Sequence, residues 1–334
     1  MRGERYNRQV LLPFIGPEGQ ERLSGASVVV VGLGALGCVS SDLLVRAGVG
    51  RLRLVDRDLV ELNNLQRQTL YDEEDVDSPK ALAALERLRA VNSDVEVEVH
   101  VKDVNHRTVM PLLEEVDLVV DGTDNLETRY LLNEACIRLS IPFIYGAALG
   151  SEGMTSTLLP PSTPCFRCLF PTPLAPGSLP TCETAGILNS AASMVGSLQA
   201  SQALRCILGE QSEGCLYVVR GWELAMERIK VRPREGCPAC VQRNFEYLEA
   251  RRRVVTQLCG REAVSVDPLL EAELQLEDLA GRLSKVGKVR LTPHVLLFEA
   301  PPYSMTIFRD GRAVIKGTDD EKAASSLYAR YIGL

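Results

Sequence analysis

Short apolar runs alternate with longer segments of helical spacing in the first half of the chain. The run ASVVVVG (26–32) is apolar at successive positions, which is typical of a strand buried on both faces. RLRLVD (51–56) is the next expected strand, and DLVVDGTDN (117–125) supplies another further along the chain. Strands that alternate with helices form parallel sheets, so this pattern predicts an α/β fold with a doubly wound, mainly parallel sheet.

Two further strands and a helix start are visible in the same region. VEVEVHV (95–101) alternates strictly, as a half-buried strand does, and PFIYGA (142–147) adds another apolar strand. In front of the helical segment KALAALERLRAVN (80–92) we expect Ser78 as the N-cap and Pro79 as the first helical residue. These elements extend the expected sheet and supply helices to cover it.

Proline interrupts this regularity between residues 160 and 180, where seven prolines argue against helices and strands. The segment ends at TCETAG (181–186), and an apolar helical pattern follows over residues 186–209. An irregular segment of this length in a compact domain is usually a lid, a binding loop or a disordered crossover. We therefore expect a crossover loop over about residues 160–182.

The chain changes character after residue 240. A charged segment, QRNFEYLEARRR (242–253), has the pattern of a helix, and residues 251–334 then mix short strands with two helices. The pair Asp310-Gly311, between TIF and AVI, predicts a hairpin turn. We expect residues 1–250 to form one domain and residues 251–334 a small α+β domain, whose role we do not predict.

The composition of the 334-residue chain excludes several classes of function. Its net charge of −7 at pH 7 argues against a nucleic-acid surface, which needs clustered basic residues. No apolar run approaches the roughly 20 residues that cross a bilayer, and the charged N-terminus lacks the apolar core of a secretory signal. We therefore expect a cytoplasmic protein that binds neither nucleic acid nor membranes.

The turn GLGALG lies between the first expected strand and the helix that follows it. Its glycines, Gly32, Gly34 and Gly37, allow a tight turn, a close approach of phosphate and close packing of helix on sheet. The helix N-terminus offers unpaired N–H groups to an anion. Asp56, at the end of the next strand, would accept hydrogen bonds from ribose hydroxyls. The sequence thus predicts a Rossmann-like nucleotide site, with a plain tight turn as the alternative.

The residues after Asp56 favour ATP over a dinucleotide. ATP extends its β- and γ-phosphates beyond the turn and needs cations aimed at them. Arg67, in NNLQRQ (63–68), could bind phosphate oxygens through its guanidinium group. Lys80 lies in the first turn of a helix, where a cation opposes the helix dipole, so we suspect that it serves a phosphate; a solvated lysine is the alternative. A Walker-type site is excluded, because the chain has no GxxxxGK[ST] motif.

Four of the ten cysteines form two C-x-x-C pairs. Cys165 and Cys168 belong to CFRC, and Cys237 and Cys240 belong to CPAC. In a cytosolic chain such pairs indicate metal binding rather than disulfides, and four thiolates without an open ligand position are typical of structural zinc. We therefore expect a tetrahedral Zn²⁺ site, with four unrelated buried thiols as the alternative.

Several motifs stand in one order along the chain: RYNRQ (5–9), GLGALG, NNLQRQ, Pro79-Lys80, DGTDN (121–125), the two C-x-x-C pairs and TCETAG. Over roughly residues 1–245 this order resembles the ThiF/MoeB/HesA family, bacterial relatives of the ubiquitin-activating enzymes, and the C-terminal extension resembles that of Bacillus-type thiamine-pathway members. The resemblance implies a homodimer in which Arg8 reaches the partner's ATP site. It implies these ATP-binding residues: Gly32, Gly34, Ala35, Gly37, Asp56, Asn63, Asn64, Leu65, Gln66, Arg67, Lys80, Asp124 and Asn125.

The resemblance also implies an activity, the adenylylation of a ubiquitin-like sulfur-carrier protein that ends in Gly-Gly. The carrier's terminal carboxylate would attack the α-phosphate of ATP and expel pyrophosphate. A carboxylate is ionised at pH 7, so no general base is required, and the three histidines lie in no motif. Catalysis would come from Arg8, Arg67 and Lys80, with Mg²⁺ held near Asp124, through positioning and charge stabilisation.

The later steps involve sulfur. Cys182 precedes a helix, whose N-terminal field lowers the pKa of a thiol, and the resemblance implies a role in sulfur or acyl transfer; a buried thiol is the alternative. The C-terminal domain contains a single cysteine, Cys259, and does not fit a rhodanese, so we expect an external persulfide donor. The thiamine-thiazole carrier is favoured over the molybdopterin-synthase carrier, because of the C-terminal extension.

Two other classes of protein fit the glycine turn less well. An NAD-dependent oxidoreductase would need a catalytic His or a Tyr–Lys pair in the second half of the chain, and none is evident. A non-catalytic binding module would tend to lose the phosphate-site cations, whereas this chain keeps Arg8, Arg67 and Lys80 together with Asp124.

Overall fold

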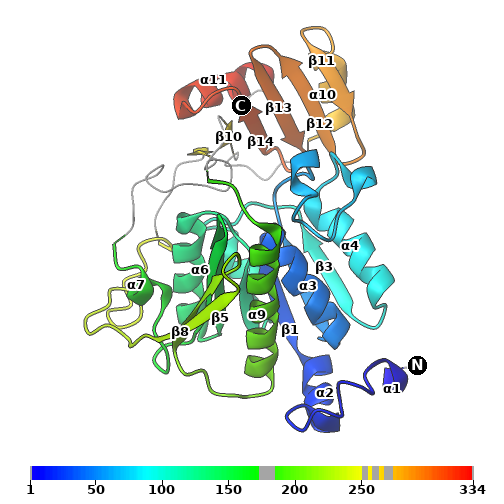
Figure 1. Ribbon diagram of the computed structural model, residues 1–334. Helices are drawn as coiled ribbons and strands as arrows, with labels where there is room; N and C mark the ends of the chain where they lie inside the picture. Colours follow the sequence, from blue (N-terminus) through cyan, green and yellow to red (C-terminus); the bar gives the residue numbers. More distant parts are fainter. Residues whose placement is uncertain (1, 173–184, 250–254, 258–262, 267–273, 333–334) are drawn as a thin grey trace. The chain divides into compact units, whose positions relative to one another are not determined.

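A computed structural model of the protein describes residues 2–172, 185–249, 255–257, 263–266 and 274–332. These residues fall into two compact units (Figure 1). The first unit comprises the described residues up to 249, and the second those from 255 onward.

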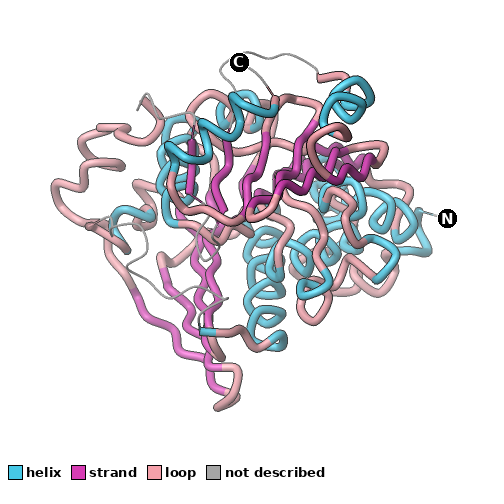
Figure 2. The backbone as a smooth tube through the Cα atoms, turned by 90° about the horizontal axis from the view of Figure 1, so that it is seen from above, coloured by secondary structure: helices cyan, strands magenta, loops and turns pink. Residues whose placement is uncertain are grey.

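The first unit is built on an eight-stranded sheet with the order β3-β2-β1-β4-β5-β6-β7-β8. Figure 2 draws the strands in magenta and the helices in cyan. The five strands from β3 to β5 in this order are parallel, and the pairs from β5 to β8 are antiparallel. The doubly wound, mainly parallel sheet expected from the sequence is thus confirmed. Its strands are β1 (Ser27–Val31), β2 (Arg51–Val55), β3 (Glu96–His100), β4 (Leu118–Asp121), β5 (Phe143–Leu149), β6 (Glu152–Leu158), β7 (Cys215–Arg220) and β8 (Ala225–Lys230).

Helices cover both faces of this sheet. Successive side chains of a strand point to opposite faces. Val28 and Val30 of β1 share a core cluster with residues of α3, α4 and α9, while Val29 and Val31 share another with residues of α5 and α6. This double burial explains the unbroken apolar run. The helices are α1 (Arg2–Arg5), α2 (Gly16–Gly25), α3 (Ala35–Ala47), α4 (Lys80–Val91), α5 (Val109–Leu112), α6 (Leu126–Leu139), α7 (Phe166–Leu169) and α9 (Asn189–Ile207), with the 3-10 turns η1 (Leu62–Asn64) and η2 (Glu73–Asp75).

Three local expectations were wrong. The proline-rich segment 160–180 was expected to lack helices and strands, but the short helix α7 fits between Pro164 and Pro171. α4 begins at Lys80, and its N-cap is Pro79, with an extended ψ of 127°, so Ser78 does not cap this helix. The described part of the segment 242–253, residues 242–249, contains no helix. Its backbone instead donates hydrogen bonds to a side chain of α6, and these tertiary contacts override the local pattern.

The second unit contains a six-stranded antiparallel sheet with the order β11-β12-β13-β14-β10-β9. α10 and α11 contribute to its core, which includes Leu279 and Tyr328. Gly311, with φ of +86°, lies in the turn between β13 and β14, as the Asp310-Gly311 pair predicts. The elements are β9 (Val255–Gln257), β10 (Ala263–Val266), α10 (Leu276–Leu283), β11 (Lys288–Leu291), β12 (Val295–Ala300), β13 (Tyr303–Phe308), β14 (Ala313–Lys316) and α11 (Glu321–Tyr331).

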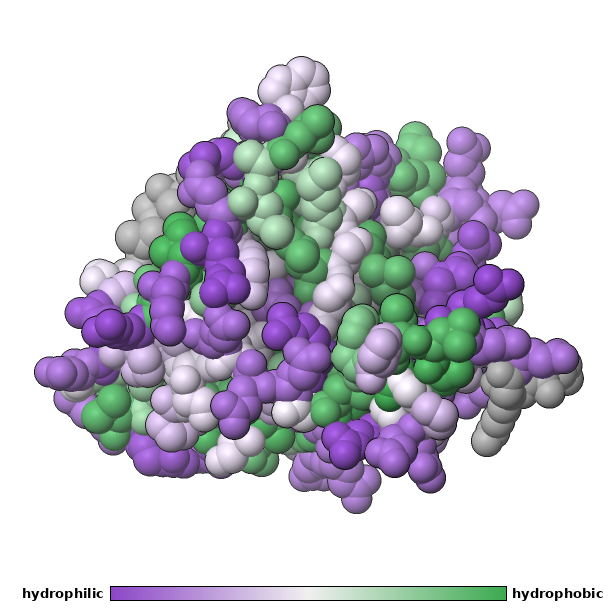
Figure 3. Space-filling view, turned by 60° about the horizontal axis from the view of Figure 1, so that its bottom comes forward, coloured by the Kyte–Doolittle hydropathy of each residue, from purple (hydrophilic) through white to green (hydrophobic). Residues whose placement is uncertain are grey.

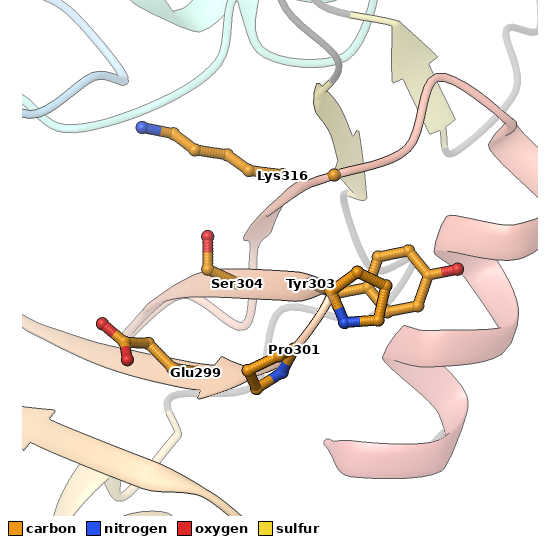
Figure 4. A pocket seen from close by; sticks show the side chains of 7 residues that line it. Glu299, Pro301, Tyr303, Ser304 and Lys316 are labelled. Carbon is orange, nitrogen blue, oxygen red and sulfur yellow. The ribbon is translucent and has the colours of Figure 1, made fainter.

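A polar row crosses this second sheet. Glu299 of β12 pairs with Ser304 of β13, which pairs in turn with Lys316 of β14. In Figure 4 the three side chains point away from the ring of Tyr303, and they line a pocket of about 270 Å³.

The described surface combines polar and apolar side chains. On the face drawn in Figure 3 the two kinds are interspersed. Trp222 and Leu224, in the turn between β7 and β8, are among the most exposed large apolar residues. No helix in the described ranges is both long and apolar enough to cross a membrane.

Candidate nucleotide-binding site

The predicted nucleotide residues gather where the order of the parallel strands reverses. β1 lies between β2 and β4, and in open α/β sheets ligands bind outside the carboxyl ends of strands at such a point. The turn GLGALG follows β1, Asp56 follows β2, and the loop that carries Asp124 follows β4. Three segments far apart in the sequence therefore meet at one edge of the sheet.

The glycine turn packs so closely that side chains are excluded at two of its positions. Gly32 has φ of +87°, and a Cβ placed there would lie 2.6 Å from the carbonyl carbon of Gly122. A Cβ on Gly37 would lie 1.9 Å from the Gly32 oxygen. Gly34 differs, since its nearest neighbour would be 3.7 Å away. Gly34 is the N-cap of α3, which begins at Ala35, so this open side of the turn leads to the helix N-terminus.

Asp56 is a buried and firmly held carboxylate. It is 8% exposed, Oδ2 accepts a hydrogen bond from the Leu33 N–H at 2.6 Å, and Oδ1 accepts one from the Asp58 N–H at 2.7 Å. Burial raises the pKa of Asp56, and the positive charge of Lys80 opposes that shift. Each oxygen keeps a further lone pair, so the carboxylate can still accept from a ribose hydroxyl.

Lys80 is not a solvated lysine. It is 5% exposed, and its Nζ lies 3.4 Å from Oδ2 of Asp58. A buried ammonium group loses its hydration, so its charge must be balanced by neighbouring groups. The cation suspected from its place in the sequence is therefore held inside the protein, within electrostatic reach of Asp56.

The NNLQRQ loop supports its own arginine. Asn64 is 1% exposed; its Nδ2 donates to Oδ1 of Asn63 at 2.6 Å, and its Oδ1 accepts from the Glu61 N–H at 3.2 Å. Nη1 of Arg67 donates to the Asn63 carbonyl at 2.8 Å. Leu65 packs against the core. The two asparagines thus brace the loop, and the ATP-binding role that the resemblance implies for both stays a prediction.

Arg67 and Gln66 also border an open groove. Its volume is about 750 Å³, and α9 and the turn between β7 and β8 supply the other walls. Asn189, at the start of α9, donates a hydrogen bond to the Gln66 carbonyl at 3.2 Å. The groove leaves one side of the loop accessible from outside.

In the loop after β4, Asp124 is exposed, whereas Asn125 has a structural task. Oδ1 of Asn125 accepts a hydrogen bond from the Thr128 N–H at 2.8 Å and so caps α6. The capping explains the asparagine at this position without a ligand. Asp124, one residue earlier, is exposed just beyond the carboxyl end of β4, within electrostatic reach of Arg57 and Arg129.

Sequence reasoning missed several charged residues around this edge. Asp58 is the partner of Lys80, and Nη1 of Arg57 lies 2.6 Å from Oδ1 of Asp103, in the segment that follows β3. A buried pair, Asp121 and Arg129, supports the loop that carries Asp124. The signal for the pair was present, because Asp121 ends an apolar strand and cannot be buried there without a partner.

Two predicted residues are not joined to the site by the structure. Arg8 is exposed, and no hydrogen bond or ion pair links it to another described residue. Cys182 lies outside the described residues. The roles predicted for both remain predictions.

The four paired cysteines come together as one cluster. The Sγ–Sγ distances are 3.8 Å for Cys165–Cys168, 3.7 Å for Cys165–Cys237 and 3.6 Å for Cys168–Cys240, and all four sulfurs lie within 4.8 Å of one another. A tetrahedron with Zn–S bonds of about 2.3 Å has edges of about 3.8 Å. The cluster therefore fits a zinc ion in size and in ligand chemistry.

Known proteins resemble the chain throughout this region. The ThiF family matches residues 6–239, which is more than half of the chain. The sulfur carrier protein ThiS adenylyltransferase of Bacillus subtilis is 42% identical over 98% of this chain and 99% of its own. The sulfur carrier protein adenylyltransferase of Thermus thermophilus is 44% identical over 71% of this chain and 90% of its own.

Solved structures share the fold. Crystal structures of E. coli MccB, one of them with ATP, superimpose with TM-scores of 0.62 and 0.61 over about 72% of this chain and 75% of theirs. Because their sequences are only 22% identical to this chain, the likeness concerns the fold alone.

Proposed function

The chain belongs to the ThiF family, and on that basis we propose that it is an ATP-dependent adenylyltransferase for a ubiquitin-like sulfur-carrier protein. The observation that carries this proposal is the 42% identity, over nearly the full length of both chains, to the ThiS adenylyltransferase of Bacillus subtilis. The site supports it, because a glycine turn, a buried carboxylate and a buried lysine meet at the carboxyl ends of β1 and β2.

In the proposed reaction the carrier's C-terminal carboxylate attacks the α-phosphorus of ATP. An oxygen–phosphorus bond forms, the bond to the β-phosphate breaks, and pyrophosphate leaves with the electron pair. The product is an acyl adenylate, whose mixed anhydride is activated for later attack by sulfur. Asp56 would hold the ribose, and Lys80 and Arg67 would stabilise charge on the phosphates.

We propose that Asp124 holds Mg²⁺ beside the α-phosphate. A carboxylate oxygen is the ligand that Mg²⁺ prefers, and the ion usually keeps its other contacts to phosphates and water. The exposed position of Asp124 at the carboxyl end of β4 suits this task. When bound, Mg²⁺ would neutralise charge on the phosphate oxygens.

We further propose a homodimer in which Arg8 completes the ATP site of the partner subunit. The support is that Arg8 is exposed and unattached to any described residue of its own chain. Arginine binds phosphate through two N–H groups at once, so one residue from a neighbour can add both charge and geometry.

The four cysteines would hold Zn²⁺ as a structural ion. Cys165 is the N-cap of α7 and Cys168 lies within it, whereas Cys237 and Cys240 lie beyond β8, so the ion would fix the start of the crossover loop to a distant segment. Phe166, between the first two ligands, donates its backbone N–H to Oδ1 of Asn133 at 2.7 Å, which anchors the cluster on α6.

For the carrier we favour a ThiS-like protein of thiamine-thiazole synthesis, because the likeness to the Bacillus enzyme includes the C-terminal unit. A molybdopterin-synthase carrier is the second candidate, since the adenylyltransferase and sulfurtransferase MOCS3 of Anopheles gambiae is 39% identical over 80% of this chain. An external persulfide would supply the sulfur: its outer sulfur attacks the acyl adenylate and expels AMP, and a thiol then cleaves the resulting acyl disulfide, which releases the thiocarboxylate and leaves a disulfide. We propose Cys182 as the residue that receives sulfur or the acyl group. Reduced thiols of this kind suit the cytoplasm, where we place the protein.

The test is ATP–pyrophosphate exchange with Mg²⁺ and purified carriers of both types. We expect exchange with the ThiS-like carrier and not with the other. Exchange with the molybdopterin-type carrier alone would reassign the pathway. No exchange with either carrier, from zinc-loaded dimeric protein, would contradict the proposed activity.

A further inference from the structure

A buried ion pair lies directly beneath the loop that carries Asp124. Asp121, the last residue of β4, is fully buried, and its Oδ2 lies 3.0 Å from Nε of Arg129 on α6. Oδ1 of Asp121 accepts from the N–H of Thr123 at 2.9 Å and from its hydroxyl at 2.7 Å. The carboxylate therefore holds the start of the loop and the arginine at once.

The guanidinium group of Arg129 extends this connection in two further directions. Its Nη2 donates to the carbonyl of Thr123, in the loop, and to the carbonyl of Gly146, in β5, at 3.1 Å. A planar group with donors in fixed directions can join a carboxylate and two carbonyls, which an ammonium group cannot do with the same geometry. Arg129 thus ties the loop after β4 to the neighbouring strand.

The same loop forms one wall of the glycine turn. A Cβ on Gly122 would lie 2.1 Å from the Gly32 oxygen, so the two backbones are in direct contact. The residue before Gly122 is also held, because Nε2 of Gln199 on α9 donates a hydrogen bond to the Asp121 carbonyl at 2.7 Å. A shift of the loop would therefore move both the turn that receives phosphate and the carboxylate proposed to hold Mg²⁺.

We propose that Arg129 is a positioning residue, which fixes the Asp124 carboxylate relative to the glycine turn so that Mg²⁺ and phosphate bind together. The inference rests on the proposed function. Electrostatics agrees with the geometry: burial acts to lower the pKa of Arg129, but Asp121, Tyr145 and Asp124 raise it, so the group stays charged within reach of Asp124.

The test compares Arg129→Lys with a matched control, Arg53→Lys, in the full-length protein. Arg53 is also a buried arginine, 7% exposed, that pairs with a carboxylate, Glu98 at 2.9 Å, and donates to two carbonyls, but it lies within β2 and its partners are remote from the loop. Calorimetric titration with α,β-methylene ATP gives the dissociation constant in Mg²⁺ and in EDTA, and the fitted stoichiometry reports any unfolded fraction separately.

The gain in affinity due to Mg²⁺ is the decisive quantity. In Arg129→Lys we expect this gain to shrink about 10- to 100-fold, which is the usual effect of changing a residue that orients a metal ligand. In Arg53→Lys the gain should change by less than about twofold. An unchanged gain in Arg129→Lys, or equal losses in both variants, would overturn the positioning role. Failure of the wild-type protein to bind the nucleotide would instead contradict the proposed function, and with it this inference.

Discussion

Nζ of Lys80 lies 3.4 Å from Oδ2 of Asp58, and the two residues come from different segments of the site edge. Asp58 follows β2 and Lys80 opens α4, so the contact holds the helix N-terminus against the loop after Asp56. Since Lys80 is 5% exposed, Asp58 also balances a charge that has lost most of its hydration. The pair thereby fixes the lysine side chain at the edge where the other predicted site residues gather.

Replacement of Lys80 should therefore impair catalysis far more than folding. In Lys80→Met the side chain keeps its length and apolar packing, while Asp58, at 29% side-chain exposure, can be hydrated. We expect kcat/KM for ATP–pyrophosphate exchange to fall about 100-fold or more, because a preorganised cation is lost. The matched control is Arg87→Met, because Arg87 is an exposed cation on the same helix. Its kcat/KM should stay within about twofold of the wild-type value. A wild-type exchange rate in Lys80→Met would contradict a role for Lys80 in this site.

The glycine turn offers a pair of substitutions that separate folding from binding. Gly37→Ala places a methyl group 1.9 Å from the Gly32 oxygen, so the turn must move and we expect a loss of stability of at least about 2 kcal/mol in urea unfolding. At Gly34 the added methyl group has open space, because its nearest contact would be at 3.7 Å. The free energy of unfolding of Gly34→Ala should therefore lie within about 0.5 kcal/mol of the wild-type value.

We expect Gly34→Ala also to weaken the binding of ATP. The Gly34 methyl group would point into the open side of the turn, and a weaker affinity for ATP at preserved stability would identify that side as the phosphate site. Equal affinity in Gly34→Ala and wild type would show that phosphate binds elsewhere.

The fold followed from sequence because its signals are local. β1 reads as an unbroken apolar run, since burial on both faces leaves no polar position, β3 reads as an alternating strand, and the Asp310-Gly311 turn was identified from turn chemistry alone. The pairs that build the site were harder to see. Asp58 and Lys80 lie 22 positions apart. Only the meeting of the ends of β2 and α4 brings them into contact.

Local errors and untested roles mark the limits of sequence reasoning. The segment 242–249 has a helical pattern, but Tyr247 and Leu248 give their N–H groups to a carboxylate on α6. Ser78 resembles an N-cap, yet the chain enters α4 one residue later. The tasks of Arg8 and Cys182 depend on a second chain or on sulfur chemistry, and the fold of one chain does not test them.

Metal analysis tests the four-cysteine cluster. We expect one zinc per chain in the purified protein. Cys168→Ser should lose the ion and at least about 3 kcal/mol of stability, since the loss of a metal site removes a link between distant segments. For the first unit, whose described residues end at 249, that corresponds to a fall in Tm of roughly 6–12 °C.

Cys215→Ser is the control for that substitution. Cys215 is also buried, but it lies on β7 and does not belong to the cluster. This variant should retain one zinc per chain. Full metal content in both variants would show that the cluster does not bind zinc.

Glu134 on α6 is a buried residue, 4% exposed. Its carboxylate accepts hydrogen bonds from the N–H groups of Tyr247 and Leu248, both at 2.8 Å. Burial raises the pKa of Glu134 to about 7, although these two hydrogen bonds act to lower it. In the unfolded chain the pKa returns to its usual value near 4.5. Between these values the folded protein binds more protons than the unfolded chain, so this group contributes stability at low pH that is lost as the pH rises through about 7.

Glu134→Gln should abolish that contribution, because the amide oxygen still accepts both hydrogen bonds but cannot ionise. Urea unfolding at pH 5 and pH 8 gives the free energy of unfolding of each protein, and any pH effect of the thiolates is common to both. We expect wild type to lose on the order of 2 kcal/mol more than Glu134→Gln between these pH values. The control Glu249→Gln changes an exposed partner of Arg138 and should follow wild type. If Glu134→Gln also follows wild type, the carboxylate is already ionised in the folded protein at pH 5, and burial does not control its titration.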